Sequence, residues 1–351
     1  MSEHSFVKAA FALVICVVSA LSSSNDIRAW EADPKLVEAA RKEGGEILVY
    51  STIRVDETML FWDRLKSKYP FVRVNQYRAG TNRMVERLMA EQRAGKYFAD
   101  VITMGDDFLL TVLTEAGVVS RYDSPQAKNF ANMFRDPKGR WTTIFIVPLT
   151  IAYNSRLVPA NEAPKSWRDL LNPKWKDKIA MESDHLVWYA GMLKALGKEK
   201  GRQFMSALSK QAIRLVGGAS IGMNLLAAGE FPIFLSRANQ TEIFKVRGAP
   251  VDWIKDPDPL LSQFHAAGMA KNAPHPSSAK LLLDFLLSEE AAEIIAQGQR
   301  VPSRKGVMKE QLSPGFREIH MDKMVPPQRE DLMVNQKKYL EEFQGLFGKG
   351  D

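Results

Sequence analysis

The stretch TIFIVPLTIAY, Thr143–Tyr153, is a long apolar run rich in the β-branched and aromatic residues that favour strands. The chain has 351 residues, which favours two domains over one at roughly 100 to 200 residues per domain. We expect Thr143–Tyr153 to carry the chain from a first lobe into a second. The chain then returns through GAPVDWI, Gly248–Ile254. Two such crossings predict a hinge, with a cleft between the lobes.

On both sides of this stretch, short β-branched runs alternate with helical patterns, which is typical of α/β layers with mainly parallel strands. The predicted division is a first lobe at 30–147 plus 255–300, a second lobe at 148–254, and a C-terminal helical tail at 301–351. The predicted strands are 46–50, 71–77, 100–104, 178–181, 213–216, 231–235 and 263–270. The predicted helices lie at 57–68, 82–94, between 185 and 210, and at 221–228, 277–287 and 328–347.

The N-terminus has the features of an export signal. Lys8 precedes the apolar run Ala9–Leu21, which is followed by three serines. This run is shorter than the roughly 20 apolar residues of a membrane-spanning helix. We therefore predict that residues 1–29 form a signal peptide and that the mature chain is periplasmic. The only cysteine, Cys16, lies inside this segment, so the mature chain would contain none.

Composition excludes several classes of protein. The chain has 48 Lys+Arg and 41 Asp+Glu, a net charge of +7, and 45% hydrophobic residues. This is ordinary globular composition, unlike that of a disordered, collagen-like or polytopic membrane protein. The basic residues are scattered, so no nucleic-acid partner is predicted. H-E-x-x-H and phosphate-loop motifs are absent and no cofactor is predicted; among the histidines, only His185, beside Asp184, is expected near the cleft.

Three turns in the first lobe follow predicted strands. They contain Ser51, Thr52 and Arg54, then Arg78, Gly80 and Thr81, and then Gly105 and Asp106. Ligands of open α/β sheets bind at the carboxyl ends of the strands. Helix N-termini attract anions, so the first two turns favour an anion site, although Thr81 alone is also a plausible helix cap.

In the second lobe, Gly218-Ala219-Ser220-Ile221-Gly222 opens a predicted helix and supports two interpretations. It matches the G-x-S-x-G nucleophile elbow of serine hydrolases, and Asp252 or Asp256 and then His275 follow in the hydrolase order. No HGG-type oxyanion segment precedes it. The alternative is that the glycines expose backbone N–H groups that hold an anion.

Several strings resemble the extracellular solute-binding proteins of ABC importers, in the cluster that includes ferric-iron binders. They are ILVYST (47–52), RAGTNRMVERLMAEQRAGKYFADVI (78–102), IAYNSRLVP (151–159), SWRDLLNPKWKDKIAM (166–181), NLLAAGEFPI (224–233), GAPVDWI (248–254) and HPSSAKLLLDFLLSEEAAEIIA (275–296). The resemblance implies a two-lobed periplasmic binding fold of the second type that closes on a small molecule and hands it to an inner-membrane permease. It also implies a cleft lined by Ser51, Thr52, Gly80, Thr81, Gly105, Asp106, Tyr153, Asp184, Ser220 and Ser236.

The chain departs from the iron binders at one place. Those relatives carry adjacent tyrosines after the strand that corresponds to 231–235, whereas this chain has Ser236-Arg237-Ala238-Asn239. We therefore expect a monomeric binding protein for an organic carboxylate, phosphate or phosphonate, with Arg78 and Arg237 as forked donors. Three alternatives stay open: ferric iron held by Tyr153 and Tyr189, a hydrolase using Ser220, and a binding protein that serves a sensor.

Overall fold

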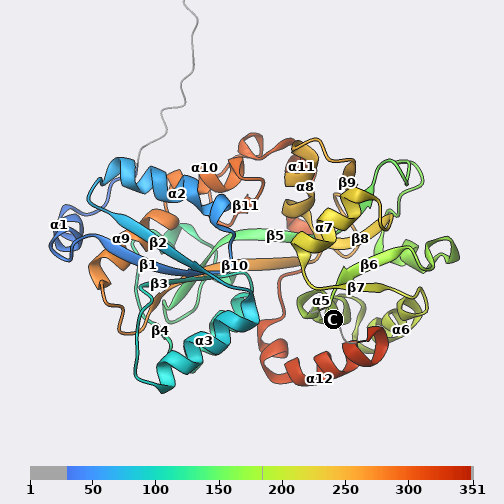
Figure 1. The fold of residues 1–351 in the computed structure, drawn as a ribbon, viewed down its shortest axis with the longest axis horizontal. Helices are drawn as coiled ribbons and strands as arrows, with labels where there is room; N and C mark the ends of the chain where they lie inside the picture. Colours follow the sequence, from blue (N-terminus) through green and yellow to red (C-terminus); the bar gives the residue numbers. More distant parts are fainter. Residues whose placement is uncertain (1–29, 184, 349–351) are drawn as a thin grey trace, which may run out of the picture.

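The computed structural model describes residues 30–183 and 185–348, so the predicted signal peptide lies outside the described residues. Its central element is strand β5, Trp141–Asn154, in which all 14 residues are buried. The first part of β5 pairs with β10, Ser262–Ala270, and the second part with β8, Ile233–Arg237. The first predicted crossing is thus one continuous strand shared by two halves of the molecule (Figure 1).

The first half is a sheet in the order β2-β1-β3-β10-β5. Strands β2, Arg73–Arg78, β1, Glu46–Ser51, and β3, Val101–Met104, are parallel, whereas β10 is antiparallel to β3 and β5. Short strands β4, Val119–Ser120, and β11, Val301–Pro302, pair with the end of β10 and with β5, respectively. Its helices are α1, Pro34–Lys42; α2, Val55–Lys68; α3, Thr81–Arg93; α4, Asp107–Glu115; α9, Pro276–Leu286; and α10, Glu289–Gln297.

The second half continues from β5 through β8 to β6, Ile179–Glu182, and β7, Arg214–Val216. Strands β6, β7 and β8 are parallel, and β9, Val251–Trp253, adds to the other edge of β5. Its helices are α5, Leu186–Leu196; α6, Lys198–Ser209; α7, Ala219–Ala228; and α8, Ala238–Val246. Gly197 separates α5 from α6. Its φ of 83° is a backbone conformation that favours glycine.

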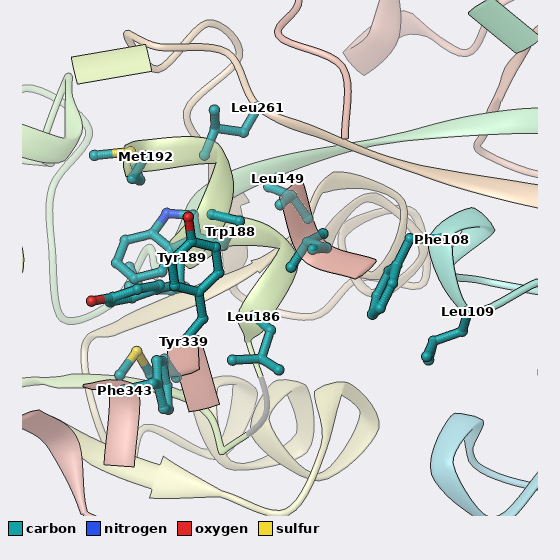
Figure 2. Close-up of a cluster of buried hydrophobic side chains, with 14 of the residues drawn as sticks. Phe108, Leu109, Leu149, Leu186, Trp188, Tyr189, Met192, Leu261, Tyr339 and Phe343 are labelled. Atoms are coloured by element: carbon teal, nitrogen blue, oxygen red, sulfur yellow. The ribbon is translucent and has the colours of Figure 1, made fainter. Parts of the chain in front are cut away.

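The last helix, α12, Arg329–Phe347, packs against α4 of the first half and against α5 and α6 of the second. Tyr339 and Phe343 of α12 are fully buried and lie beside Tyr189 of α5 (Figure 2). The segment predicted as a helical tail begins with β11, which pairs with β5. The lobe boundaries drawn from the sequence stay predictions. No helix in residues 30–183 or 185–348 is long and apolar enough to cross a membrane.

Candidate functional site

A cavity of about 550 Å³ lies between the two halves. Its lining comes mainly from the turns that follow β1, β2, β3, β6, β7 and β8, at the carboxyl ends of these strands. This is the edge at which open α/β sheets place their ligands. The predicted residues that line it are Thr52, Arg54, Arg78, Gly80, Thr81, Gly105, Asp106, His185, Gly218, Ser220 and Arg237.

Three predicted residues do not line the cavity. Ser51 is fully buried behind it, where its Oγ accepts hydrogen bonds from Thr103 Oγ1 at 2.8 Å and from the Ile53 N–H at 3.0 Å. Ser51 thereby fixes the turn that carries Thr52. Ser236 is fully buried beside Met223, and Tyr153 is 5% exposed within the core. Asp184, the remaining predicted residue, lies outside the described part of the chain.

Besides α2, whose N-cap residue Arg54 also lines the cavity, five further helices of nine or more residues begin at the cavity without a side-chain cap from the described residues. They are α3, α4, α5, α7 and α8, with Gly80, Asp106, His185, Gly218 and Arg237 as N-cap residues. Elsewhere, Asp33 caps α1, Ser288 caps α10, and the Glu43 carboxylate accepts from the first N–H groups of α9. Uncapped first turns present N–H groups and the positive end of the helix dipole. Their convergence makes this cavity suited to negative charge.

Four arginines and three carboxylates line the cavity, and most of them pair with one another. Arg54 donates two hydrogen bonds of 2.9 Å to Asp56. Arg300 forms an ion pair with Glu57. The Arg78 side chain makes no hydrogen bond or ion pair with any residue that the structure describes, and it is exposed to the cavity. Arg78 is therefore the arginine whose guanidinium is available to a ligand.

A chain of polar contacts crosses the base of the cavity. Gln263 of β10 donates from Nε2 to Asp106 and accepts a 2.7 Å hydrogen bond from Arg237 Nε. Arg237 Nη1 donates to Glu182, which is 3% exposed. The expectation that Arg237 would offer its whole fork to a ligand therefore needs correction, because two of its donors are engaged inside the protein.

His265 of β10 also lines the cavity, although the sequence pointed only to His185. Its ring stacks on Phe145, with centroids 4.6 Å apart. Burial lowers the pKa of His265 well below its usual value, and nearby Arg300 lowers it further. His265 is therefore neutral and adds no charge to the site.

Sequence analysis missed Glu182, Gln263, His265 and Arg300. The position of Glu182, one residue beyond a predicted strand, was the available signal. The other three come from β10 and the segment after α10, which reach the cavity only through the antiparallel return of the chain.

The two tyrosines proposed for iron do not line the cavity. The Tyr189 hydroxyl donates a 2.8 Å hydrogen bond to Glu342 of α12. Burial raises the pKa of Tyr153 and of Tyr189, with nearby Asp252 and Glu342 acting in the same direction. A phenolate ligand needs the opposite shift. In the described ranges, no group of three His, Cys, Asp or Glu residues is arranged to hold a metal ion.

The structure does not assemble the hydrolase triad. Ser220 lines the cavity, but its hydroxyl makes no hydrogen bond with the part of the chain described here. His275 Nδ1 lies 3.1 Å from Asp100, and Asp256 contacts His320 at 2.8 Å. Asp252 accepts a 2.8 Å hydrogen bond from Lys245. The candidate base and both candidate acids therefore have other partners.

Residues 96–319 match the family model described as bacterial extracellular solute-binding protein. The chain is 23% identical over 239 residues to a putative 2-aminoethylphosphonate-binding periplasmic protein of Salmonella typhimurium, covering 64% of this chain and 68% of that protein. It is 21% identical to the spermidine/putrescine-binding periplasmic protein of Escherichia coli, covering 85% of this chain and 81% of that protein. An uncharacterised Haemophilus influenzae protein is 22% identical, but the match spans only 56% of its length and 51% of this chain.

Solved structures with the same fold are periplasmic and transporter-associated binding proteins. A substrate-binding protein of an ABC transporter from Agrobacterium tumefaciens superposes with a TM-score of 0.77 at 16% identity, covering 87% of this chain and 96% of that one. Iron-bound HitA from Pseudomonas aeruginosa superposes with a TM-score of 0.73 at 19% identity, covering 86% of this chain and 99% of that one. AfuA from Actinobacillus pleuropneumoniae, with fructose-6-phosphate bound, superposes with a TM-score of 0.75 at 20% identity, covering 86% of this chain and 98% of that one. These likenesses confirm the predicted two-lobed binding fold of the second type.

Proposed function

Because the chain belongs to the bacterial extracellular solute-binding proteins of ABC importers, we propose that it captures a small organic anion in the cavity between its lobes. The anionic group is a carboxylate, phosphate or phosphonate. The signal peptide, residues 1–29, directs export. The mature protein then works in the periplasm as a monomer and delivers its solute to an inner-membrane permease. Binding and delivery need no catalytic step.

The observation that carries this proposal is the convergence of five uncapped helix N-termini beside Arg78. A helix N-terminus presents several aligned N–H donors with a partial positive charge of roughly half a unit. Arg78 adds a planar, forked donor that matches two anion oxygens. An anion is the ligand that satisfies both features at once.

The size of the cavity favours an organic solute over a bare ion. Small-molecule sites occupy about 300 to 1,000 Å³, and this cavity, at about 550 Å³, falls within that range. The names of two similar proteins, one for 2-aminoethylphosphonate and one with bound fructose-6-phosphate, support a phosphorus-containing anion. The polyamine-binding and iron-bound relatives supply the competing ligand classes.

Ligand capture would work by closure of the two lobes. Gly80 and Thr81 open α3 in the first lobe, and Gly218 and Ser220 open α7 in the second. An anion that bridges these helix ends contacts both lobes, so it binds the closed form more tightly than the open form. This difference in affinity shifts the population toward closure.

A thermal-shift screen of the mature protein tests the proposal. The panel contains small carboxylates, phosphates and phosphonates, with ferric citrate and spermidine as the competing classes. We expect at least one organic anion to raise the melting temperature in a concentration-dependent way. Stabilisation by spermidine alone would contradict the proposal. A stoichiometric visible charge-transfer band with ferric citrate, lost in Tyr153→Phe or Tyr189→Phe, would contradict it in favour of iron.

A further inference from the structure

One side of the cavity is apolar and involves the C-terminal helix. Phe108 and Leu109 of α4, Leu186 and Val187 of α5, and Leu340 of α12 line it together. Helix α12 packs against both α4 and α5, so these side chains belong to one surface, here called the α12 wall. Figure 2 shows several of them within the same buried cluster as Tyr339 and Phe343. The rest of the lining combines the polar turns, which include Arg78, with side chains of β5 and β10 such as Phe145, Leu149 and Gln263.

Helix α12 makes polar contacts with both halves. At its start, Arg329 forms an ion pair with the buried carboxylate of Asp107, and its guanidinium lies 4.9 Å from the Trp141 ring. Near its end, Glu342 accepts hydrogen bonds from Tyr189 at 2.8 Å and from Arg202 at 3.0 Å. These contacts place α12 in the lining of the cavity.

Two α12 residues face the cavity one helical turn apart. Gln336 and Leu340 are half-buried, and both line the cavity. Gln336 makes no side-chain hydrogen bond with the described residues, so its amide is available at the edge of the apolar surface. Neither residue carries charge, and none of the described residues that form the α12 wall is a cation that could hold an anion there.

We infer that the bound solute carries, besides its anionic group, an uncharged and mainly apolar portion that lies against the α12 wall. This inference rests on the proposed function and specifies its ligand class. The anionic group occupies the polar turns, where the helix N-termini and Arg78 lie. The remainder extends toward Leu186 and Leu340, where burial of apolar surface adds affinity. Leu340 and Gln336 are then residues that determine ligand specificity.

The test compares inorganic phosphate with methyl-, propyl- and pentylphosphonate, and acetate with butyrate and hexanoate, by calorimetric titration of the mature protein. Each methylene that reaches the α12 wall is expected to tighten binding about fourfold, the equivalent of about 0.8 kcal/mol. Leu340→Ala should weaken the longest members at least threefold and leave phosphate and acetate unchanged. Gln336→Leu enlarges the apolar surface and should tighten the longest members at least twofold.

Val334→Ala is the matched control, because Val334 is 83% exposed on α12 and does not line the cavity. If Leu340→Ala fails to fold by circular dichroism, Gln336→Leu still tests the inference through its opposite sign. Equal affinity along both series, or loss of affinity for phosphate and long-chain members alike in Leu340→Ala, would overturn the inference and leave the proposed function standing. Binding of none of these anions would overturn both.

Discussion

Arg237 Nε donates a 2.7 Å hydrogen bond to Gln263 Oε1, which ties the start of α8 to β10 at the base of the cavity. Because Arg237 also pairs with Glu182, its positive charge is balanced inside the protein. Arg78 has no such balance among the described residues. The two arginines that look equivalent in the sequence therefore differ in the structure: Arg237 is engaged at the base of the cavity, and we propose that Arg78 provides charge for the ligand.

Replacing Arg78 should affect binding far more than folding. Arg78→Ala removes a charged donor with no intramolecular partner among the described residues, so we expect affinity for an organic anion to fall by about 1.5 to 3 kcal/mol. The free energy of unfolding of the ligand-free protein should stay within about 0.5 kcal/mol of the wild-type value. Calorimetric titration and urea denaturation measure the two quantities. An unchanged dissociation constant would show that Arg78 does not contact the solute.

Replacing Arg237 should destabilise the ligand-free protein. Arg237→Met leaves the buried Glu182 carboxylate without this partner and should lower the free energy of unfolding by about 1 to 3 kcal/mol, a value reduced because Arg237 is 24% exposed. Adding Glu182→Gln to the same chain removes the buried charge and should restore part of the loss. Urea denaturation of the two single variants and the double variant closes the cycle. Additive losses would mean that the pair is not coupled.

A carboxylate placed at the start of α3 should imitate the ligand. Gly80 has φ of −64° and ψ of 158°, and a Cβ there would meet no atom within 4 Å. Gly80→Asp should therefore cap α3 and raise stability by a few tenths of a kcal/mol, while competing with the anion and weakening its binding at least tenfold. Gly80→Asn is the control, because it caps without charge. If Gly80→Asp and Gly80→Asn bind equally well, the α3 terminus does not hold the anion.

The Asp107–Arg329 pair predicts a distinct pH dependence of stability. Burial raises the pKa of Asp107 to about 6. The charge of nearby Asp106 contributes to this rise, and Arg329 opposes it. The folded state thus binds more protons than the unfolded state between about pH 4 and 6. The share of the unfolding free energy that depends on Asp107 should therefore rise as pH falls from 7 to 4, by on the order of 2 kcal/mol.

The measurement is the difference in unfolding free energy between wild type and Asp107→Asn at pH 7, 6, 5 and 4. Asp107→Asn has no titrating group at this position, so its unfolding free energy should not show that rise. The unfolding free energy of wild type minus that of the variant should therefore increase as pH falls. Carboxyls with lowered pKa values, such as Asp136 beside Arg140, lower the unfolding free energy as pH falls. They are present in both proteins, so their effect cancels in the difference. A difference that is constant with pH would contradict the shift.

The order of strands and helices was predictable because each buried strand is marked by its own residues. Strand β3, read as DVITM, is fully buried at Val101–Met104, and α3, predicted at 82–94, buries Met84 and Leu88. The turns after the strands could also be identified, since parallel strands end at a common edge. Eleven of the predicted ligand residues therefore line one cavity.

What the sequence did not show depends on contacts between distant segments. Glu182 and Gln263, which engage Arg237, lie 55 and 26 residues away along the chain. Gln336 and Leu340 reach the cavity only because α12 packs back across α4 and α5. Local patterns identify which residues end a strand, but they do not say which of them are already paired within the folded protein.

The most direct test of the central claim is to identify the solute that the protein carries. Native mass spectrometry of the mature protein isolated from periplasm should show a non-covalent adduct, and the released solute should be an organic molecule that bears a carboxylate, phosphate or phosphonate. The same preparation of Arg78→Ala should have lost most of this adduct. An adduct with the mass of iron, or a released polyamine, retained in Arg78→Ala, would contradict the account.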